Sequence, residues 1–432
     1  MREGEIPDTP APPGPLHAGH DPYAVLRNRD FLLYLVGRLI AAFGQQMLTV
    51  AVGWELYERT QSALNLGYVG LTQMIPMVLC TLPAGHVADN FERKRVVMAM
   101  ISVIAAASLG LTLISALHAP VFWIYVCLFV SGTARTFLWP ASAAFLPHLV
   151  PRNMFSRAVT WNSGTFHLSA VAGPAAGGAL IALTHNAVTV YAINTTAALI
   201  CLVLVWFIRR RHVVEVKEKM TFTTLMAGFN FVLHNRIIFG TITLDMFAVV
   251  LGGATALLPV YAKDVLHVGP SGLGLLQAAM PAGAVFCALI IAHRPPMEKA
   301  GRALLWGVAA FGAGIIVFGL SRWFWLSFVA LFVCGAVDNV SVVVRHTLVQ
   351  LLAPDEKRGR VSAVNSLFIG TSNEFGGFRS GAVAHWFGPA MGNAIATGAL
   401  VSVVSGGVGT ILVVLAVALI WPEIRRYGRL DS

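Results

Sequence analysis

Twelve apolar runs divide this sequence, and they constrain its fold more than any other feature. A helix needs about 20 apolar residues to cross the hydrocarbon core of a bilayer. Only 12% of the residues are charged, whereas a soluble domain carries about twice that share. The sequence therefore predicts an all-α integral membrane protein embedded in the lipid bilayer. The predicted transmembrane helices are 31–57, 65–87, 96–117, 121–145, 157–183, 187–208, 237–262, 270–292, 301–320, 324–347, 361–386 and 398–421.

Lysine and arginine are shared unevenly between the predicted loops. The loops and tails on the side of the N-terminus hold 23 of the 30 basic residues, and the other side has only Arg59, Lys263 and Arg322. Basic residues are favoured on the cytoplasmic side of a membrane protein. We therefore expect a multi-pass protein of the cell inner membrane with both termini in the cytoplasm. The same clustering accounts for the net charge of +10 without a nucleic-acid partner.

An internal repeat relates the two halves of the chain at a constant offset of 203 residues. Segment 151–163 aligns without gaps to segment 354–366. Matching residues continue into the helices that follow: Ser169/Ser372, Gly173/Gly376, Gly178/Gly381 and Ala179/Ala382. Such repeats are typical of transporters whose substrate site lies between the halves, near the bilayer midplane. We expect two pseudo-symmetric six-helix bundles, at 26–208 and 237–421.

Three polar segments flank these bundles. Residues 1–25 are rich in proline and lack an apolar core, which predicts a disordered cytoplasmic tail rather than a signal peptide. Residues 209–236 form the one long polar connection, and residues 422–432 form a second cytoplasmic tail. Five apolar residues of the connection fall on one helical face, which predicts an amphipathic helix along the membrane surface. They are Phe222, Leu225, Met226, Phe229 and Leu233.

The stretch 85–95 reads GHVADNFERKR and connects the second and third apolar runs. Its glycine permits close approach of two backbones, and its aspartate can accept from Arg93 or cap a nearby helix. We interpret the stretch as a gate that latches one packing of the helices. The alternative is a basic loop that only fixes orientation. The residues concerned are Gly85, Ala88, Asp89, Arg93, Lys94 and Arg95.

The fifth apolar run contains the segment GPAAGGAL, which begins at Gly173. Pro174 removes a backbone donor and predicts a kink at which the helix can bend, while Gly177 and Gly178 permit close packing against a neighbour. The alternative is glycine packing alone, because Gly and Pro are common in membrane helices.

Eight charged residues fall inside the predicted helices, and their formal charges sum to zero. An unpaired charge at mid-bilayer costs roughly 3 kcal/mol or more. We therefore expect these residues to pair with one another or to face a wet central cavity. They are Arg38, Arg135, Arg345, Arg379, Glu55, Asp245, Asp338 and Glu374.

Three of these carboxylates are candidate proton sites, because a desolvated carboxylate can carry protons at neutral pH. Asp338 is the first candidate, Glu374 the second and Asp245 the third, and the alternative for each is a fixed ion pair. The 203-residue offset puts Arg135 and Asp338 at equivalent positions, which predicts opposite charges facing each other across the pseudo-symmetry axis. Arg345 is a candidate for closing the inner mouth of the cavity.

Three polar residues are candidates for the lining of that cavity. Gln45 and Gln46 lie mid-span in the first helix and could bind substrate, or bridge helices by hydrogen bonds. His167 could relay protons, or pack as a hydrogen-bonded histidine. The sequence shows no phosphate-binding loop, zinc motif, nucleophile elbow or Cys-x-x-Cys pair. We expect no cofactor, no metal and no enzymatic activity.

The stretch 85–95 resembles the signature G-x-L-A-D-[RK]-x-G-[RK]-[RK] of major facilitator superfamily transporters. Five residues match it: Gly85, Ala88, Asp89, Arg93 and Lys94. Val87, Asn90 and Glu92 depart from it, the last at the position of a usual glycine. GPAAGGAL resembles the antiporter-associated GPxxGG signature of the same superfamily. This resemblance implies the major facilitator fold.

The second half of the chain resembles the enterobactin-exporter-like branch of that superfamily. The resemblance rests on ATALLPVYAKDVLHVGPSGLGLLQAAMPAGA at 254–284 and PDEKRGRVSAVNSLFIG at 354–370. It implies proton-driven, alternating-access efflux of a small organic molecule, such as a siderophore-like metabolite or a drug, and we expect a monomer. One alternative is an importer of a metabolite or lysophospholipid. A non-transporting membrane receptor or enzyme is the alternative from another class.

Overall fold

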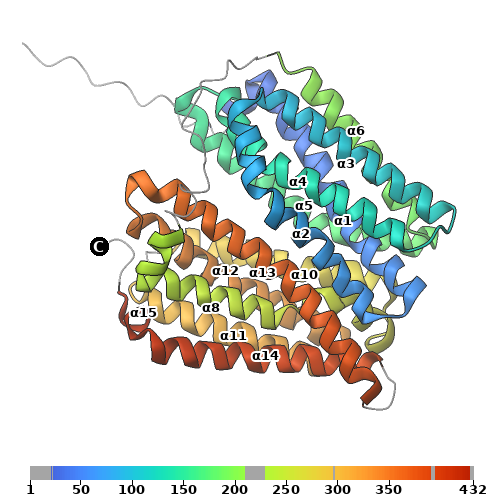
Figure 1. Cartoon of the computed structure of the whole chain (residues 1–432), viewed down its shortest axis with the longest axis vertical. Coiled ribbons are helices and arrows are strands. Elements are labelled where there is room, and N and C mark those ends of the chain that lie inside the picture. The colour runs from blue at the N-terminus through green and yellow to red at the C-terminus, as the bar shows by residue number, and fades with distance from the viewer. Residues whose placement is uncertain (1–20, 22, 210–228, 295–296, 391–394, 429–432) are drawn as a thin grey trace, which may run out of the picture.

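The computed structural model describes residues 21, 23–209, 229–294, 297–390 and 395–428, and these residues form helices joined by short loops. Figure 1 shows two groups of helices, one from each half of the chain. The protein has the all-helical fold that the sequence predicts, with twelve membrane-spanning helices in two bundles.

The N-terminal bundle contains six helices, and each matches its predicted run to within four residues at either end. They are α1 (Arg29–Thr60), α2 (Ala63–Asn90), α3 (Arg93–Ala116), α4 (Phe122–Leu149), α5 (Phe155–Thr184) and α6 (Val188–Trp206). The side chain of Asn28 caps α1 by accepting from the backbone N–H of Asp30 at 3.1 Å. Helix α1 packs against α5 and α6, whereas α4 packs between α2 and α3.

The C-terminal bundle repeats this arrangement. Its long helices are α8 (Arg236–Gly252), α10 (Gly269–Ala292), α11 (Ala300–Leu320), α12 (Phe324–Leu352), α13 (Asp355–Ala390) and α14 (Ile395–Ile420). Eleven helical segments of the described chain are long and apolar enough to cross a membrane, and α13 is not among them. Helix α13 is the twelfth spanning helix, because it runs for 36 residues and packs along α2, α8 and α14.

The predicted helix 237–262 is interrupted near its middle. Helix α8 ends at Gly252, and a 3-10 turn (Ala254–Leu257), the short helix α9 (Leu258–Val260) and a π-helical turn (Tyr261–Val265) follow. Two successive glycines explain the break, since Gly252 and Gly253 both lower helix propensity there. The seventh spanning segment is therefore discontinuous, and its second part lies beside the end of α1.

Short segments at both ends of the described chain pack more firmly than their composition suggests. Residues Ala24–Arg27 form a 3-10 turn in which Val25 is fully buried, although we predicted a disordered tail to residue 25; residues 1–20 and 22 lie outside the described residues. Residues Pro422–Arg426 form α15, in which Ile424 is buried. One apolar side chain in each segment anchors it despite its polar neighbours.

The predicted amphipathic helix falls mostly outside the described residues. Residues 229–234 are helical, and they include the last two residues of its predicted apolar face, Phe229 and Leu233. Phe229 stacks on Phe368 of α13 with ring centroids 6.1 Å apart.

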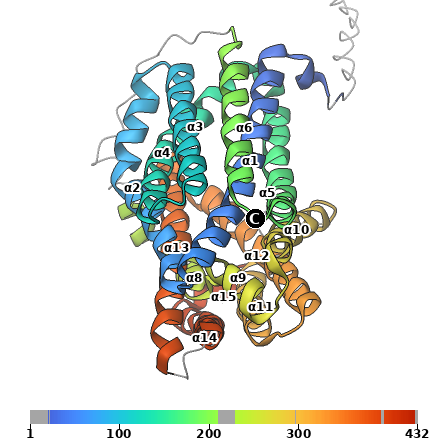
Figure 2. The ribbon, with the colours of Figure 1, turned by 90° about the vertical axis from the view of Figure 1, so that its right-hand side faces the viewer.

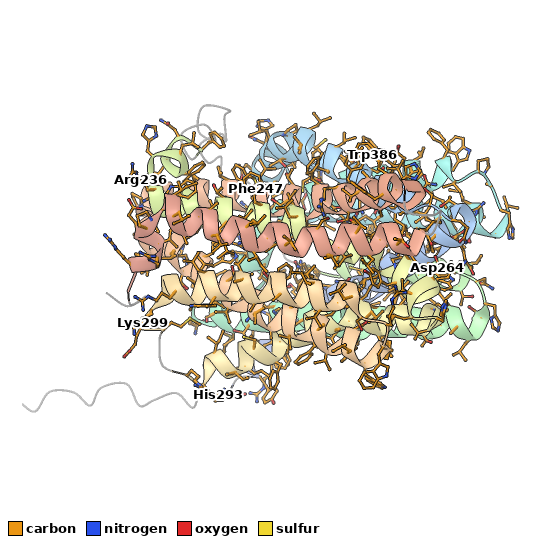
Figure 3. The ribbon with its side chains drawn as sticks, turned by 90° about the horizontal axis from the view of Figure 1, so that it is seen from below. Arg236, Phe247, Asp264, His293, Lys299 and Trp386 are labelled. Atoms are coloured by element: carbon orange, nitrogen blue, oxygen red, sulfur yellow. The ribbon has the colours of Figure 1, made fainter. Side chains whose placement is uncertain are left out.

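We call the end of the molecule that carries α15 and the α2–α3 connection the terminal side, and the opposite end, with the α1–α2 connection, the far side. Figure 3 shows Arg236, His293 and Lys299 toward the terminal side and Asp264 toward the far side. The helices of the two bundles diverge toward the terminal side (Figure 1).

The bundles meet at a close crossing of α5 and α10 toward the far side (Figure 2). A Cβ atom added to Gly178 would lie 2.3 Å from the carbonyl oxygen of Pro270 and 2.9 Å from Cα of Gly274. The two backbones therefore touch where neither glycine has a side chain, which is how membrane helices approach most closely.

A second crossing of the same kind joins α2 to α13. A Cβ atom added to Gly381 would lie 2.5 Å from the carbonyl oxygen of Ala63 and 2.8 Å from Cα of Gly67. Gly381 is the partner of Gly178 in the 203-residue repeat. The two crossings are thus equivalent contacts, one on each flank of the interface between the bundles.

A candidate substrate cavity between the bundles

A cavity of about 480 Å³ lies between the two bundles. Helices α1 to α5 line it on one side, and the 3-10 turn after α8, α9, α10 and α13 line it on the other. Its polar lining residues are Gln45, Gln46, Thr49, Gln73, Ser108, Ser131, Arg135, Thr255, Gln277, Asn373 and Glu374. Gln45 and Gln46 therefore lie where the sequence suggested, and substrate binding by them stays a prediction.

Two opposite charges face the cavity, and they come from different bundles. Arg135 of α4 donates to the side-chain oxygen of Gln73 on α2. Its charge also interacts with that of Glu374 on α13, although the two do not form an ion pair in the described structure. They are the only charged residues among those described in the lining. The arrangement can hold a polar molecule between an anionic and a cationic wall.

The prediction that Arg135 faces Asp338 is wrong for this structure. Asp338 does not line the cavity, and its charge interacts with Asp245 and Arg345 inside the C-terminal bundle. The two positions are equivalent in sequence, but Glu374 occupies the place opposite Arg135 because α13, rather than α12, packs along α2.

Polar contacts across the bundles close the far side of the cavity. The hydroxyl of Tyr57, at the end of α1, donates to the carboxylate of Asp264 in the π-helical turn. Lys263 lies 4.0 Å from the carboxylate of Glu58, and its ammonium sits 5.9 Å from the centre of the Trp54 ring. We call these five residues the far-side latch. Lysine over an aromatic ring adds a cation–π attraction to the ion pair.

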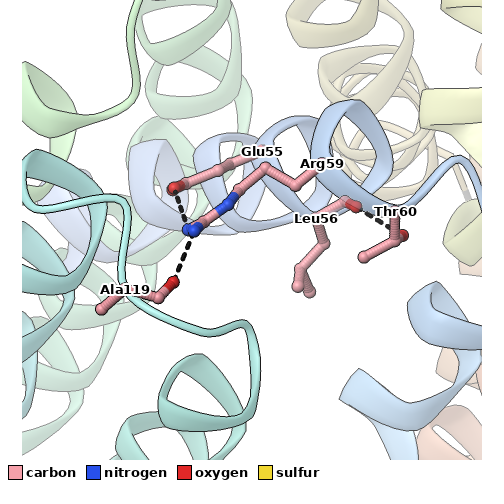
Figure 4. A network of polar contacts seen from close by, with 5 residues as sticks. All are labelled: Glu55, Leu56, Arg59, Thr60 and Ala119. Atoms are coloured by element: carbon pink, nitrogen blue, oxygen red, sulfur yellow. Dashed lines mark hydrogen bonds and ion pairs between the residues drawn. The ribbon is translucent and has the colours of Figure 1, made fainter.

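A network in the N-terminal bundle fixes the end of α1 that carries this latch (Figure 4). Glu55 is only 8% exposed, and it forms an ion pair with Arg59 at 3.1 Å. Arg59 also donates to the carbonyl oxygen of Ala119 in the loop between α3 and α4. The charge of Glu55 is therefore balanced within its own helix, and the neighbouring Tyr57 is held in place.

A second group of charges lies inside the C-terminal bundle. Asp245 of α8 forms an ion pair with Arg345 of α12, and the two residues are 7% and 2% exposed. Asp338 lies seven residues before Arg345 on α12 and interacts with both charges. Two carboxylates thus share one arginine. Arg345 is buried, so it does not stand at an inner mouth in this structure, contrary to our expectation.

The other two intramembrane arginines bind neutral oxygens. Arg379 of α13 donates to the carbonyl oxygens of Leu251 and Ser402, each at 3.1 Å, and to the hydroxyl of Ser405 at 3.2 Å. It thereby satisfies a carbonyl exposed by the break after α8. Arg38 donates to the hydroxyl of Tyr34 at 3.3 Å. Neither forms an ion pair with a described carboxylate, which differs from the predicted pairing.

His167 does not take the predicted place in the cavity. Its side chain is exposed, and its ring lies against Phe166 with centroids 5.7 Å apart. It is not among the described residues that line the cavity. Phe166 and Leu168 are exposed on the same stretch of α5, so this face of the helix points away from the bundle interior.

The predicted gating stretch is tied to the N-terminal bundle. Arg93 donates to the carbonyl oxygen of Ala144 at 3.3 Å, and Lys94 donates to that of Ile208 at 2.7 Å. Arg95 pairs with Glu92 at 2.6 Å.

Arg93 therefore does not pair with Asp89, as we expected it could. Within the described chain, Asp89 forms no ion pair, while Gly85 and Ala88 are buried. The gate thus makes no contact of its own across the bundles in this structure, and its role stays a prediction.

The predicted hinge in the fifth helix forms a close contact with α1. Helix α5 is continuous through Pro174, which lines the cavity. A Cβ atom on Gly173 would lie 2.6 Å from Cβ of Gln46, and one on Gly177 would lie 2.9 Å from Cα of Met47. These distances agree with the glycine-packing interpretation. Bending at this segment stays a prediction.

Sequence reasoning missed several residues of the site. The amides Gln73, Gln277 and Asn373 lie within apolar runs, and polar residues inside predicted spans were the signal that could have identified them. The pairing of Tyr57 with Asp264 joins positions 207 residues apart, and no local pattern could have revealed it.

Curated proteins of similar sequence cover nearly the whole chain. The enterobactin exporter EntS of Citrobacter koseri is 24% identical over 398 residues, which cover 92% of this chain and 93% of that protein. The enterobactin exporter EntS of Escherichia coli O1:K1 / APEC has the same identity and the same coverage.

Solved structures show the fold independently. A bacterial homolog of the human lysosomal transporter Spinster superposes with a TM-score of 0.69 at 13% identity, over 94% of this chain and 98% of that chain. A D-xylose-proton symporter gives 0.69 at 14% identity, over 93% and 99%. Residues 20–418 match the family described as transmembrane secretion effector. The chain is thus a multi-pass membrane transporter and not an enzyme, and it belongs to the transmembrane secretion effector family of the major facilitator superfamily.

Proposed function

We propose that the protein exports a small organic molecule across the inner membrane in exchange for protons, and that it works as a monomer. The cavity between the bundles, closed on the far side by contacts that cross them, is the observation that carries the proposal. Export is supported by the relatives named as exporters at 24% identity. One chain supplies every described wall of the cavity, which supports a monomer.

The charge distribution supports a cytoplasmic terminal side. With that orientation, the structure is closed to the outside by the far-side latch and the two glycine crossings. Substrate would then enter from the cytoplasm, and separation of the crossings would open the cavity outward. In that second state the terminal ends of the bundles approach, and the stretch 85–95 becomes the latch on the cytoplasmic side. Asp89, which forms no ion pair among the described residues, would acquire its partner there.

The charge group of the C-terminal bundle is the proposed proton site. Asp245 and Asp338 together carry one more negative charge than Arg345 balances. In a low-dielectric interior, a proton on one carboxylate neutralises the group, and Asp338 is the more exposed of the two. Glu374 would act in the cavity itself, where substrate and proton compete for a carboxylate facing Arg135.

Proton coupling is tested by neutralising each carboxylate in proteoliposomes with an imposed pH gradient. Asp338→Asn should abolish uphill transport while the protein remains folded in the membrane. Asp30→Asn at the terminal end of α1 is the matched control and should transport normally. Retained uphill transport by Asp338→Asn would remove that residue from coupling.

The direction of transport is tested in cells of the source organism with and without the gene. Small molecules in the growth medium are compared by untargeted mass spectrometry under iron-replete and iron-limited conditions. A compound that disappears from the medium and accumulates inside the deleted cells supports export. A compound that remains in the medium because deleted cells do not take it up would replace the proposal with import of a metabolite or lysophospholipid.

A further inference from the structure

The chemistry of the cavity wall restricts what the cavity can hold. Five of the described lining residues are carboxamides and four carry hydroxyl groups, while the remaining lining is mostly aliphatic. Each carboxamide offers both a donor and an acceptor, so the wall can match groups that also do both. Amide and hydroxyl groups have this property. A buried wall of this kind rejects molecules that leave its polar groups unpaired.

The charges of the wall restrict the net charge of the substrate. Arg135 and Glu374 sum to zero, and they come from opposite bundles. A molecule with an unbalanced charge would have to lose its hydration at a site with no net opposite charge. An uncharged molecule, or one whose positive and negative groups cancel, meets no such cost.

Aromatic side chains are absent from the described lining of the cavity. Aromatic ligands and organic cations gain affinity chiefly by stacking on Phe, Tyr and Trp rings. The rings nearest in sequence serve the closure of the far side instead. Tyr68 stacks on Phe378 across the bundles at 6.1 Å, and Tyr125 donates to the carbonyl oxygen of Asn65 at 2.9 Å.

We infer that the substrate is a small aliphatic molecule without net charge, rich in amide and hydroxyl groups. The inference rests on the proposed function and narrows it. It excludes aromatic cations and catechol-bearing molecules from the preferred substrates, even though the curated relatives are named for enterobactin. The cavity volume of about 480 Å³ is in the range that encloses a drug-sized molecule.

The test uses the full chain in proteoliposomes and the low-molecular-weight extract of the source cells as the probe. Liposomes with and without the protein are incubated in the extract, with and without a pH gradient, and their contents are compared by mass spectrometry. Accumulation of aliphatic, uncharged or zwitterionic compounds supports the inference. An accumulated compound with an aromatic ring or a net charge overturns the substrate class and leaves transport standing. If nothing accumulates beyond empty liposomes, the proposed function itself fails.

Variants then tie the transported compound to the wall. Gln73→Leu and Gln277→Leu each remove one carboxamide, and the initial rate at low concentration should fall roughly 2- to 10-fold, as expected for one hydrogen bond. Gln350→Leu is the matched control, because Gln350 is exposed near the terminal end of α12. Equal rates for all three variants and the unmodified chain would overturn recognition by the amide wall.

Discussion

The close crossing of α2 and α13 predicts the effect of a single methyl group. In Gly381→Ala the new Cβ atom would lie 2.5 Å from the carbonyl oxygen of Ala63 and 2.8 Å from Cα of Gly67. Both are backbone atoms, so no side chain can turn aside to make room. The variant should therefore resist closure of the far side and favour the state in which the far side is open.

The size of the effect follows from the distances. To reach an ordinary contact of 3.4 Å from 2.5 Å, the two backbones must separate by about 0.9 Å. Overpacking of this kind costs typically about 1–3 kcal/mol. The cost is removed when the crossing separates, so it acts on one state only. We expect the ratio of far-side-open to far-side-closed protein to rise about 5- to 150-fold.

Spin-label distances measure this ratio in purified protein. The five free cysteines are first replaced, and one label pair is placed at Leu117 and Trp323, which are exposed in far-side loops. A second pair at Phe91 and Leu351, exposed toward the terminal side, reports the opposite mouth. Gly381→Ala should lengthen the first distance and shorten the second.

A matched glycine substitution separates closure from general disturbance of a helix. A Cβ atom on Gly164 of α5 would meet nothing within 4 Å, so Gly164→Ala should leave both distances unchanged. Gly178→Ala repeats the test at the equivalent crossing, where the clash with Pro270 is 2.3 Å. If folded Gly381→Ala and Gly178→Ala both gave the distances of the unmodified protein, the crossings would not be closure contacts.

Three further substitutions test other parts of the structure. Arg379→Met should lower the thermal unfolding midpoint, because each buried carbonyl that loses its donor costs about 1–3 kcal/mol; an unchanged midpoint would contradict its bridging role. Arg345→Met leaves Asp245 buried without its partner and should cost about 3–5 kcal/mol in the same assay. Adding Asp245→Asn should recover part of that loss, and no recovery would argue against the pair. Tyr57→Phe removes the hydroxyl that binds Asp264 and should lengthen the far-side label distance, whereas an unaltered distance would exclude this latch contact.

Hydropathy and the repeat were sufficient to predict the fold, because both depend on local composition. A run of apolar residues must become a helix in a bilayer, whatever surrounds it. The offset that pairs Gly178 with Gly381 also identified two residues that the structure places at equivalent crossings. The break after Gly252 was missed, although the two adjacent glycines were its signal.

The partners of the charges could not be predicted in the same way. Charge balance indicated that Arg135 and Arg379 would be satisfied, but not by which groups. Arg135 meets Gln73 and Glu374, whereas Arg379 binds backbone carbonyls that exist only because α8 is broken. Such partners depend on the rotation of each helix about its own axis, and packing among twelve helices decides that rotation.

The two glycine crossings also bear on the ancestry of the molecule. Each joins a fifth helix of one half to a second helix of the other, with Gly178 meeting Pro270 and Gly381 meeting Ala63. In a symmetric dimer of identical six-helix chains, both contacts would be one sequence used twice, and any substitution would alter both. Joining the halves in one chain lets each crossing change alone. Selection can then tune the two flanks of the transporter separately.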